Sequence, residues 1–226
     1  MLCENLNLLF MKRMKKGILY FLLSTTLIVS ACSADADSEQ EALAVLAPET
    51  EMKIVSSIIQ DNEFVSENKL FISEYDEDEC YNITPDFVAE NSDFAIFKYI
   101  KSTESFIKYD DHVYSIGTCF GGYGITSVAL ADINMDHQYE LYYTFSWGSG
   151  IHRSEIGYFD PVNKEITIFD ESFYDSDMIL TVNESGDLCV NSAVLDFDTY
   201  VDFSIKAENL MGKIIFDRDE IVLNMF

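Results

Sequence analysis

Short apolar and aromatic runs alternate with polar turns along most of the chain after residue 91. The runs are rich in aromatic and β-branched residues, which is typical of β-strands. Asp110-Asp111, between two such runs, fits a tight hairpin turn. No connection after residue 104 is long enough for a crossover helix, so we expect antiparallel pairing. The predicted strands are 94–99, 105–109, 112–116, 124–131, 140–145, 155–159, 165–169, 178–182, 188–195, 200–205, 213–216 and 221–226.

Helical spacing is confined to the region before these strands. Met52, Val55, Ile58 and Ile59 recur at the spacing of one helix face, so we predict a short amphipathic helix there. A second short helix is expected after Thr84, with Pro85 at its first position. The predicted fold class is therefore all-β: an antiparallel multi-stranded meander, propeller-like or sandwich, with one or two short N-terminal helices.

The first residues carry the pattern of an export signal. A basic segment at 11–16 precedes an uncharged, mostly apolar run at 17–30, and Val29-Ser30-Ala31-Cys32 follows directly. This ending resembles the lipobox of bacterial lipoproteins, which implies lipidation of Cys32 and anchoring at the extracytoplasmic face of the cell membrane. An uncleaved anchor helix is the alternative, although the run is shorter than the roughly 20 residues that a membrane span needs.

Glu4 precedes the basic segment, which is unusual for an export signal, so we expect translation to begin at Met11 or Met14. After Cys32 the chain is small, polar and acidic, and it becomes rich in large apolar residues only from about residue 51. The predicted organisation is a signal peptide at 1–31, a flexible tether at 32–50 and a single mainly-β domain at 51–226.

Composition and charge limit the kinds of molecule that the chain can bind. The 226 residues are 48% hydrophobic, which is enough to bury a sizeable core, and the net charge of -26 excludes a nucleic-acid-binding surface. Divalent cations are the partners that such a charge favours, although a solvated acidic surface is the commoner explanation. Cys80, Cys119 and Cys189 permit at most one disulfide inside the domain, or else three separate buried thiols.

Candidate metal chemistry lies between the strands predicted at 124–131 and 140–145. Oxygen-bearing side chains occupy every second position there, and alternating oxygen donors suit calcium, which takes six to eight oxygen ligands. A helix-flanked calcium loop would need a carboxylate at its twelfth position, which here is Tyr143. A polar turn that binds nothing is the alternative. The predicted ligands are Asp132, Asn134, Asp136, Gln138 and Glu140.

This stretch resembles the calcium-binding loop of FG-GAP repeats, found in integrin-α-type propellers and in related bacterial surface repeats. The likeness covers roughly residues 113–160 and includes Phe120-Gly121 at the place of the repeats' Phe-Gly. It implies a calcium site between two strands. The repeats carry glycine where this chain has His137, so a shared backbone path would force His137 into a strained conformation. One copy is present, and a propeller needs at least four blades.

A glycine-containing loop at 147–154 follows the next strand. Trp147, His152 and Arg153 are candidate ligand contacts, since Trp and Arg often dominate binding energies. The alternative is a hairpin loop folded back onto the calcium site, with Arg153 paired to its carboxylates.

No convincing catalytic pattern is present: Ser149 and Ser154 lack the surroundings of a nucleophile elbow, and the histidines form no zinc motif. We therefore predict a cell-surface lipoprotein with a calcium-stabilised β domain that binds a glycan or protein ligand. A secreted hydrolase acting on cell-wall or host polymers, using an acidic pair or His152, is the alternative.

Overall fold

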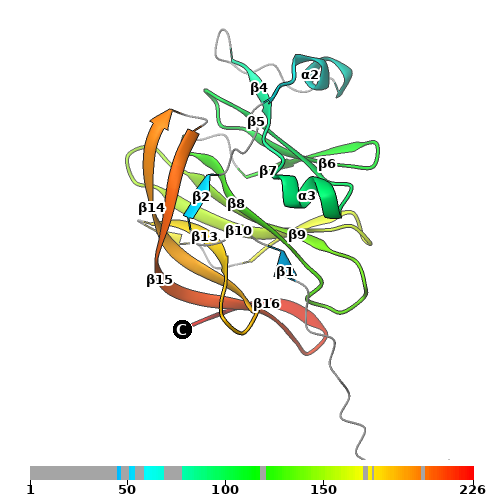
Figure 1. The fold of residues 1–226 in the computed structure, drawn as a ribbon, viewed down its shortest axis with the longest axis vertical. Coiled ribbons are helices and arrows are strands. Elements are labelled where there is room, and N and C mark those ends of the chain that lie inside the picture. Colours follow the sequence, from blue (N-terminus) through cyan, green and yellow to red (C-terminus); the bar gives the residue numbers. More distant parts are fainter. Residues whose placement is uncertain are drawn as a thin grey trace, which may run out of the picture. The chain divides into compact units, whose positions relative to one another are not determined.

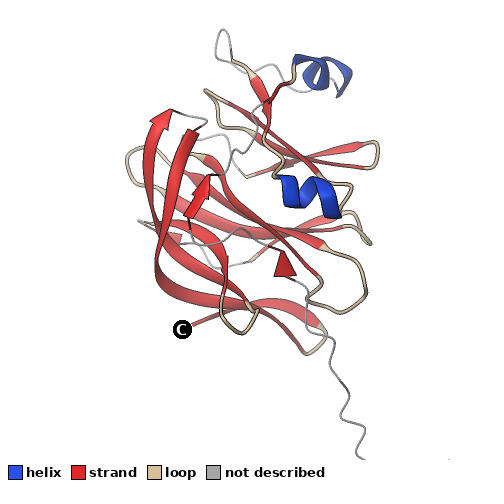
Figure 2. Cartoon of the chain, viewed as in Figure 1, coloured by secondary structure: helices blue, strands red, loops and turns tan. Residues whose placement is uncertain are grey.

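Strands dominate the described part of the chain, as the red elements in Figure 2 show (Figures 1 and 2). The computed structural model describes residues 45–46, 51–53, 59–68, 78–117, 121–169, 173–174, 176–199 and 202–226. The predicted signal peptide, Cys32, most of the tether, Cys119 and Phe120 lie outside these residues. All described residues belong to one compact unit, Ala42–Phe226. None of the described helices is long and apolar enough to cross a membrane.

The described strands form three antiparallel sheets, which confirms the all-β prediction. The central sheet has the order β1-β8-β9-β10-β11, and β12 also pairs with β10. Its strands are β1 (Val45–Leu46), β8 (Gly124–Ala131), β9 (Glu140–Trp147), β10 (Arg153–Asp160), β11 (Glu165–Ile168) and β12 (Phe173–Tyr174).

The N-terminal sheet has the order β3-β4-β5-β6-β7, and the C-terminal sheet has the order β13-β14-β15-β16 with β2 also on β15. The N-terminal sheet contains β3 (Ile59–Gln60), β4 (Cys80–Asn82), β5 (Ala95–Tyr99), β6 (Ser105–Tyr109) and β7 (His112–Ile116). The C-terminal sheet contains β2 (Glu51–Lys53), β13 (Asp177–Val182), β14 (Leu188–Thr199), β15 (Asp202–Asp217) and β16 (Glu220–Met225), and Figure 1 shows β14 and β15 as a long curved pair.

The central sheet packs against the other two sheets with its two faces. Val128 and Leu130 of β8 join a core with residues of the N-terminal sheet, such as Ile96 and Ile107. Ala129 of β8 and its neighbours pack instead against the C-terminal sheet, in a second core with Leu180 and Val190. Successive side chains of a strand point to opposite faces, so burial of both faces explains why β8 is apolar without alternation. The layered packing corresponds to the sandwich form of the prediction.

Two short helices are present in the described chain, but the first is not where the apolar spacing predicted it. Glu51–Lys53 and Ile59–Gln60, at the two ends of the predicted helix, are strands β2 and β3, and helix α2 follows at Asn62–Asn68. The β2 backbone pairs with Ser204–Lys206 of β15, a distant contact that local spacing does not reveal.

Helix α3 (Asp86–Asn91) confirms the second predicted helix, with a shifted start. Pro85 is the N-cap residue and makes no side-chain cap bond. Thr84 does not cap the helix; its hydroxyl donates to Asn82 Oδ1 at 2.6 Å and accepts from the Ile96 amide at 2.8 Å. Thr84 therefore ties the helix entrance to β4 and β5.

Candidate metal centre

The metal loop, residues 132–139, joins the ends of β8 and β9. Ala131 pairs with Glu140 in the antiparallel ladder, so the loop closes at a fixed point of the sheet. The Asp132 carboxylate then accepts two backbone amides from within the loop, Asp136 N at 2.9 Å to Oδ1 and His137 N at 2.9 Å to Oδ2. Side-chain oxygens that bond nearby amides are a usual way to hold a tight turn.

Three of the predicted ligands come together in this loop. One oxygen each from Asp132, Asp136 and Glu140 lies within 4.8 Å of the others. Among the acidic, His and Cys side chains of the described residues, these three form the group that could hold a metal ion. Carboxylates at such separations repel one another in the absence of a positive charge. The arrangement therefore favours a bound cation.

Glu140 is the member of the triad whose surroundings are most unusual. Its side chain is 0% exposed. Oε2 accepts hydrogen bonds from the Ile133 amide at 3.2 Å and the Tyr142 hydroxyl at 3.0 Å, whereas Oε1 is buried without a hydrogen-bond partner in the described part of the chain. A buried carboxylate oxygen without a donor is costly, and a metal ion is one group that removes this cost.

The electrostatics of Glu140 agree with its geometry. Burial is the main cause that raises the pKa of this carboxyl from 4.5 to about 7. Hydrogen bonds from Ile133 and Tyr142 lower the pKa, and the neighbouring Asp136 and Asp132 raise it. A cation beside Oε1 would oppose the effects of burial and of the neighbouring carboxylates, because it stabilises the ionised form.

Asn134 and Gln138, the remaining predicted ligands, contribute to the shape of the loop. Asn134 Oδ1 accepts the Asp136 amide at 2.9 Å, and its Nδ2 donates to Asp136 Oδ2 at 3.3 Å. The Gln138 amide donates to Asp136 Oδ1 at 2.8 Å, while its side chain is exposed. Asn134 and Gln138 thus hold Asp136 in place beside Asp132.

The backbone at His137 takes the path that a glycine would favour. His137 has φ 70° and Met135 has φ 60°, both in the left-handed region. Such values are uncommon for residues other than glycine, although asparagine, aspartate and histidine adopt them more often than most. The prediction that His137 accepts backbone strain is therefore confirmed.

The 147–154 loop lies at the other end of the same strands. Trp147 pairs with Arg153 across β9 and β10, and the Arg153 guanidinium carbon lies 4.9 Å from the centre of the Trp147 ring. The eight residues of β9 separate this loop from the metal loop, roughly 24 Å at the usual rise per residue. The alternative in which Arg153 neutralises the metal-loop carboxylates is therefore wrong.

His152, in the same loop, belongs to a polar cluster that the sequence did not indicate. Its Nδ1 lies 3.1 Å from Asp177 Oδ2, and its ring packs edge-on against Tyr123 with 4.6 Å between ring centres. The other oxygen of Asp177 accepts the Ser146 hydroxyl. Asp177 is 25 residues from His152 in the chain, and no motif links them.

This cluster has the groups of a catalytic triad in the wrong order. A serine nucleophile needs a histidine base beside it, with the carboxylate behind the histidine. Here Asp177 stands between Ser146 and His152, and Ser146 is fully buried. Ser154, the other serine nearby, donates to the Ser176 carbonyl and accepts the Met178 amide, so its hydroxyl is engaged in packing.

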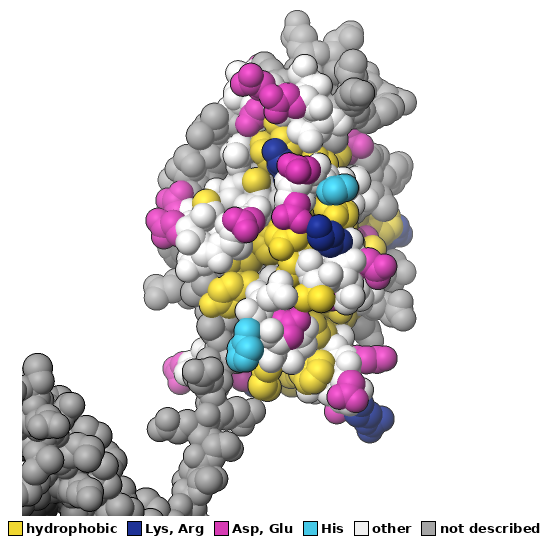
Figure 3. All heavy atoms as spheres, turned by 90° about the vertical axis from the view of Figure 1, so that its right-hand side faces the viewer, with side chains coloured by type: hydrophobic (Ala, Val, Ile, Leu, Met, Phe, Trp, Pro, Cys, Tyr) yellow, Lys and Arg dark blue, Asp and Glu magenta, His cyan; other side chains and the backbone are white. Residues whose placement is uncertain are grey.

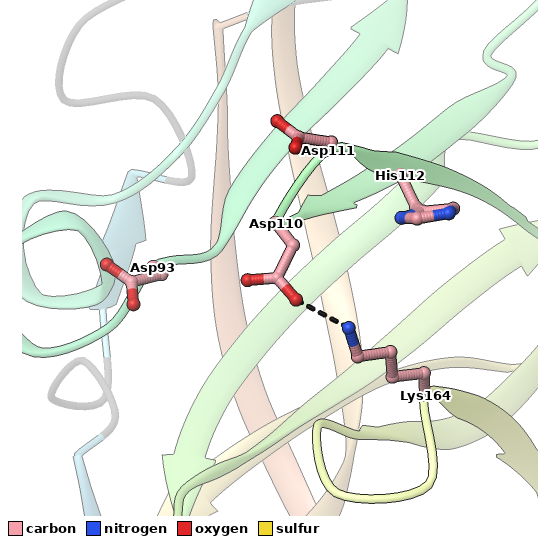
Figure 4. A pocket seen from close by; sticks show the side chains of 5 residues that line it. All are labelled: Asp93, Asp110, Asp111, His112 and Lys164. Atoms are coloured by element: carbon pink, nitrogen blue, oxygen red, sulfur yellow. Dashed lines mark hydrogen bonds and ion pairs between the residues drawn. The ribbon is translucent and has the colours of Figure 1, made fainter.

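A surface hollow of about 500 Å³ lies elsewhere, lined by Asp93, Asp110, Asp111, His112 and Lys164 (Figure 4). Lys164 Nζ and Asp110 Oδ2 form an ion pair at 2.6 Å, and both side chains are about half exposed. Acidic side chains are also spread over the face shown in Figure 3, among hydrophobic and neutral ones. Solvation explains these groups without a ligand.

Comparisons with protein families, characterised proteins and solved structures find no match to this chain. The class of protein defined so far is an all-β domain of three antiparallel sheets in the described chain, with an acidic loop that could hold a metal ion.

Proposed function

We propose that the metal loop binds Ca²⁺ and that this chain is a calcium-stabilised binding domain of a lipid-anchored cell-surface protein. The observation that carries the metal assignment is the buried Glu140: one of its oxygens lies within 4.8 Å of an oxygen of Asp132 and of Asp136, and its Oε1 has no hydrogen-bond partner among the described residues. A buried carboxylate with an open coordination position between two further carboxylates is suited to a cation.

Calcium fits the donor set better than the other common metals. The candidate donors of the loop are oxygens, and hard oxygen donors favour Ca²⁺ or Mg²⁺ over zinc and copper. Magnesium requires a nearly ideal octahedron and gives up water reluctantly, whereas calcium tolerates irregular loops. Sites outside the cell fill even with dissociation constants of about 10⁻⁴ to 10⁻³ M, so a partly exposed loop is sufficient.

The role of the ion is structural. Asp132 follows the last residue of β8, and Glu140 is the first residue of β9, so one ion bound to both would join the ends of these two strands. These strands are buried along nearly their whole length between the two cores. A clamp at this end therefore stabilises the centre of the domain.

Calorimetric titration with CaCl₂ tests the metal assignment. We expect a single site for the wild type and at least a tenfold weaker one for Asp136→Ala, because the variant loses a charged ligand. Asp111→Ala is the matched control, since Asp111 is an exposed aspartate of the β6–β7 turn. Equal affinities of the wild type and Asp136→Ala would refute the site.

The surface location rests on the segment 29–32 and its resemblance to a lipobox. Replacing Cys32 by Ser removes the thiol that would carry the lipid. We expect the Cys32→Ser variant to leave the membrane fraction after export. Continued membrane association of this variant would contradict lipid anchoring.

The 147–154 loop is the best candidate for ligand contact. Trp147, the last residue of β9, and Arg153, the first residue of β10, stack together at one end of these strands, and Ile151 at the loop tip is 60% exposed. Aromatic and arginine side chains of this kind suit a glycan or protein ligand. Arrays of wall and host glycans, probed with the wild type and with Arg153→Ala, test this role. Equal binding by both proteins would show that the 147–154 loop does not contact the ligand.

A hydrolase is the second candidate, favoured by the His152–Asp177 pair. His152 could act as a base on a water molecule, because the Asp177 carboxylate orients its ring. If the chain is a hydrolase, His152→Ala abolishes turnover of wall polymers and preserves their binding. The order of Ser146, Asp177 and His152 makes the binding role the better supported one.

A further inference from the structure

The strap, defined here as the two-residue strand β1 (Val45–Leu46), lies beside the metal loop. Val45 pairs with Ala131 and Leu46 pairs with Leu130, the last two residues of β8. The next residue of the chain after Ala131 is Asp132, the first candidate ligand. The strap is therefore attached to the sheet one residue away from the candidate metal centre.

Such a short strand cannot hold itself in place. Ordering a residue costs about 1 to 2 kcal/mol of backbone entropy, and a hydrogen bond returns only about 0.5 to 1.5 kcal/mol net. Backbone pairing alone therefore holds the strap weakly, so its docking is sensitive to how well the opposite strand is fixed. That strand end is also where Ala131 pairs with Glu140 and where the triad carboxylates repel one another without a cation.

We propose that cation binding at the metal loop and docking of the strap on β8 are coupled, so that the N-terminal segment is released when the ion leaves. This proposal rests on the calcium site proposed above. With an ion bound, the end of β8 is fixed and offers a regular edge to the strap. Without the ion, the repelling carboxylates loosen this end, and the strap loses its partner.

Release would lengthen the connection that precedes the domain. The strand β2 (Glu51–Lys53) pairs with β15 in the C-terminal sheet, whereas the metal loop joins two strands of the central sheet. We therefore expect β2 to stay docked when the ion leaves. Release would therefore move the first described attachment of the chain from the strap to β2. The metal loop would thus set how far the domain stands from whatever its N-terminal segment is attached to.

Thermodynamic linkage makes the coupling reciprocal. If calcium strengthens strap docking by some factor, docking strengthens calcium binding by the same factor.

In an antiparallel pair, hydrogen-bonded and non-hydrogen-bonded positions alternate, so only one of Val45 and Leu46 exchanges backbone hydrogen bonds with β8. Proline removes the backbone donor, and an edge strand tolerates it at the other position. Val45→Pro and Leu46→Pro therefore serve as each other's matched control.

Hydrogen exchange of the purified full chain, with CaCl₂ or with a chelator, tests the coupling. We expect calcium to slow amide exchange in the strap at least about fivefold. Exchange in β2, another short edge strand, serves as the internal reference and should not change. Calorimetry should show calcium affinity weakened by a matching factor in one of the two proline variants and nearly unchanged in the other.

The outcomes separate this inference from the proposed function. Calcium binding without any change in strap exchange overturns the coupling and leaves the calcium site standing. Equal calcium affinity in both proline variants and the wild type also overturns it. Failure of the wild type to bind calcium overturns the site and the coupling together.

Discussion

His137 is one of two residues of the metal loop, with Met135, that adopt the left-handed backbone conformation. Its φ of 70° lies in the left-handed region, which costs a residue with a side chain about 1 to 2 kcal/mol. Glycine avoids this cost but adds entropy to the unfolded chain. We predict that His137→Gly raises the free energy of unfolding by up to about 1 kcal/mol. Urea unfolding in calcium measures the change.

Gln138→Gly is the matched control for that substitution. Gln138 neighbours His137 but is not among the residues with positive φ, so glycine there should destabilise by about 0.5 to 1 kcal/mol. If His137→Gly unfolds at the same or a lower urea concentration than the wild type, the strain at His137 does not affect stability.

Lys98 is a buried cation remote from the metal loop in sequence. It is 3% exposed, its Nζ donates to the Tyr123 carbonyl, and burial lowers the pKa of its ammonium from 10.5 to about 7. Between pH 7 and 10.5 the unfolded chain therefore holds more protons at this residue than the folded chain. Stability contributed by this group rises with pH in that window and is flat below it.

The variant Lys98→Met removes this titration. We predict that the difference in unfolding free energy, wild type minus variant, increases between pH 7 and 9 by at most about 1.4 kcal/mol per pH unit. Losing the hydrogen bond to Tyr123 lowers the unfolding free energy of the variant by the same amount at each pH and does not change the slope. Urea unfolding at pH 7, 8 and 9 gives the slope, and parallel curves for the two proteins would show that Lys98 does not titrate there.

At the scale of elements, hydroxyl groups of the central sheet bind the backbone of β13. Thr126 Oγ1 donates to the Met178 carbonyl at 3.0 Å, and the Leu180 amide donates to Ser127 Oγ at 2.8 Å. A register shift between Ile125 and Ser127 interrupts the ladder beside Thr126. Polar side chains on β8 thus satisfy backbone groups of β13 that lie in the core.

Ser154 makes the corresponding bonds from β10. It accepts the Met178 amide at 2.9 Å and donates to the Ser176 carbonyl at 3.1 Å. We predict that Ser154→Ala destabilises the protein by about 1 to 3 kcal/mol, because both groups lose a buried partner. The exposed Ser149→Ala is the control and should be neutral. A neutral Ser154→Ala in urea unfolding would mean that this hydroxyl does not fasten β13.

Short-range patterns predicted most strands because hairpins are local. The β6–β7 hairpin, for example, turns at Asp110, whose φ of 53° suits the predicted tight turn. Distant pairing explains the errors. The apolar spacing around Met52 suggested a helix, but β2 finds its partner at Ser204–Lys206. The strands predicted at 200–205 and 213–216 overlap one longer strand, β15, which continues through the exposed Glu208 and Asn209.

The difference between local patterns and distant contacts also decides which parts of the candidate sites could be predicted from the sequence. The acidic triad lies within nine residues of chain, so its spacing could be recognised from Asp132 to Glu140. The burial of Glu140 could not be recognised from the sequence, because it depends on the C-terminal sheet packing over the face of β9 that Glu140 shares with Tyr142. The Asp177–His152 pair joins β13 to the loop before β10, and only the folded chain brings these residues together.

At the scale of the whole molecule, the net charge of -26 complicates any calcium experiment. Calcium would stabilise so acidic a chain by general screening even without a site, since like charges repel in the compact state. A background of about 0.15 M monovalent salt limits screening by added calcium, because the Debye length is then about 8 Å. Magnesium at the same concentration controls for divalent charge.

Under these conditions the midpoint of thermal unfolding distinguishes a site from screening. Calcium at a hundred times its dissociation constant adds about 2.7 kcal/mol to the folded state, and a chain of this size gains roughly 2 to 4 °C per kcal/mol. We predict a rise of about 5 to 10 °C for the wild type with calcium, and less with magnesium. Asp136→Ala retains the overall acidity but lacks a ligand; with a site at least tenfold weaker, the same calcium concentration adds at most about 1.4 kcal/mol, so calcium should raise its midpoint by about half the wild-type rise or less. Equal rises in both proteins would assign the stabilisation to screening of the acidic surface, because only a specific site distinguishes Asp136 from the other carboxylates.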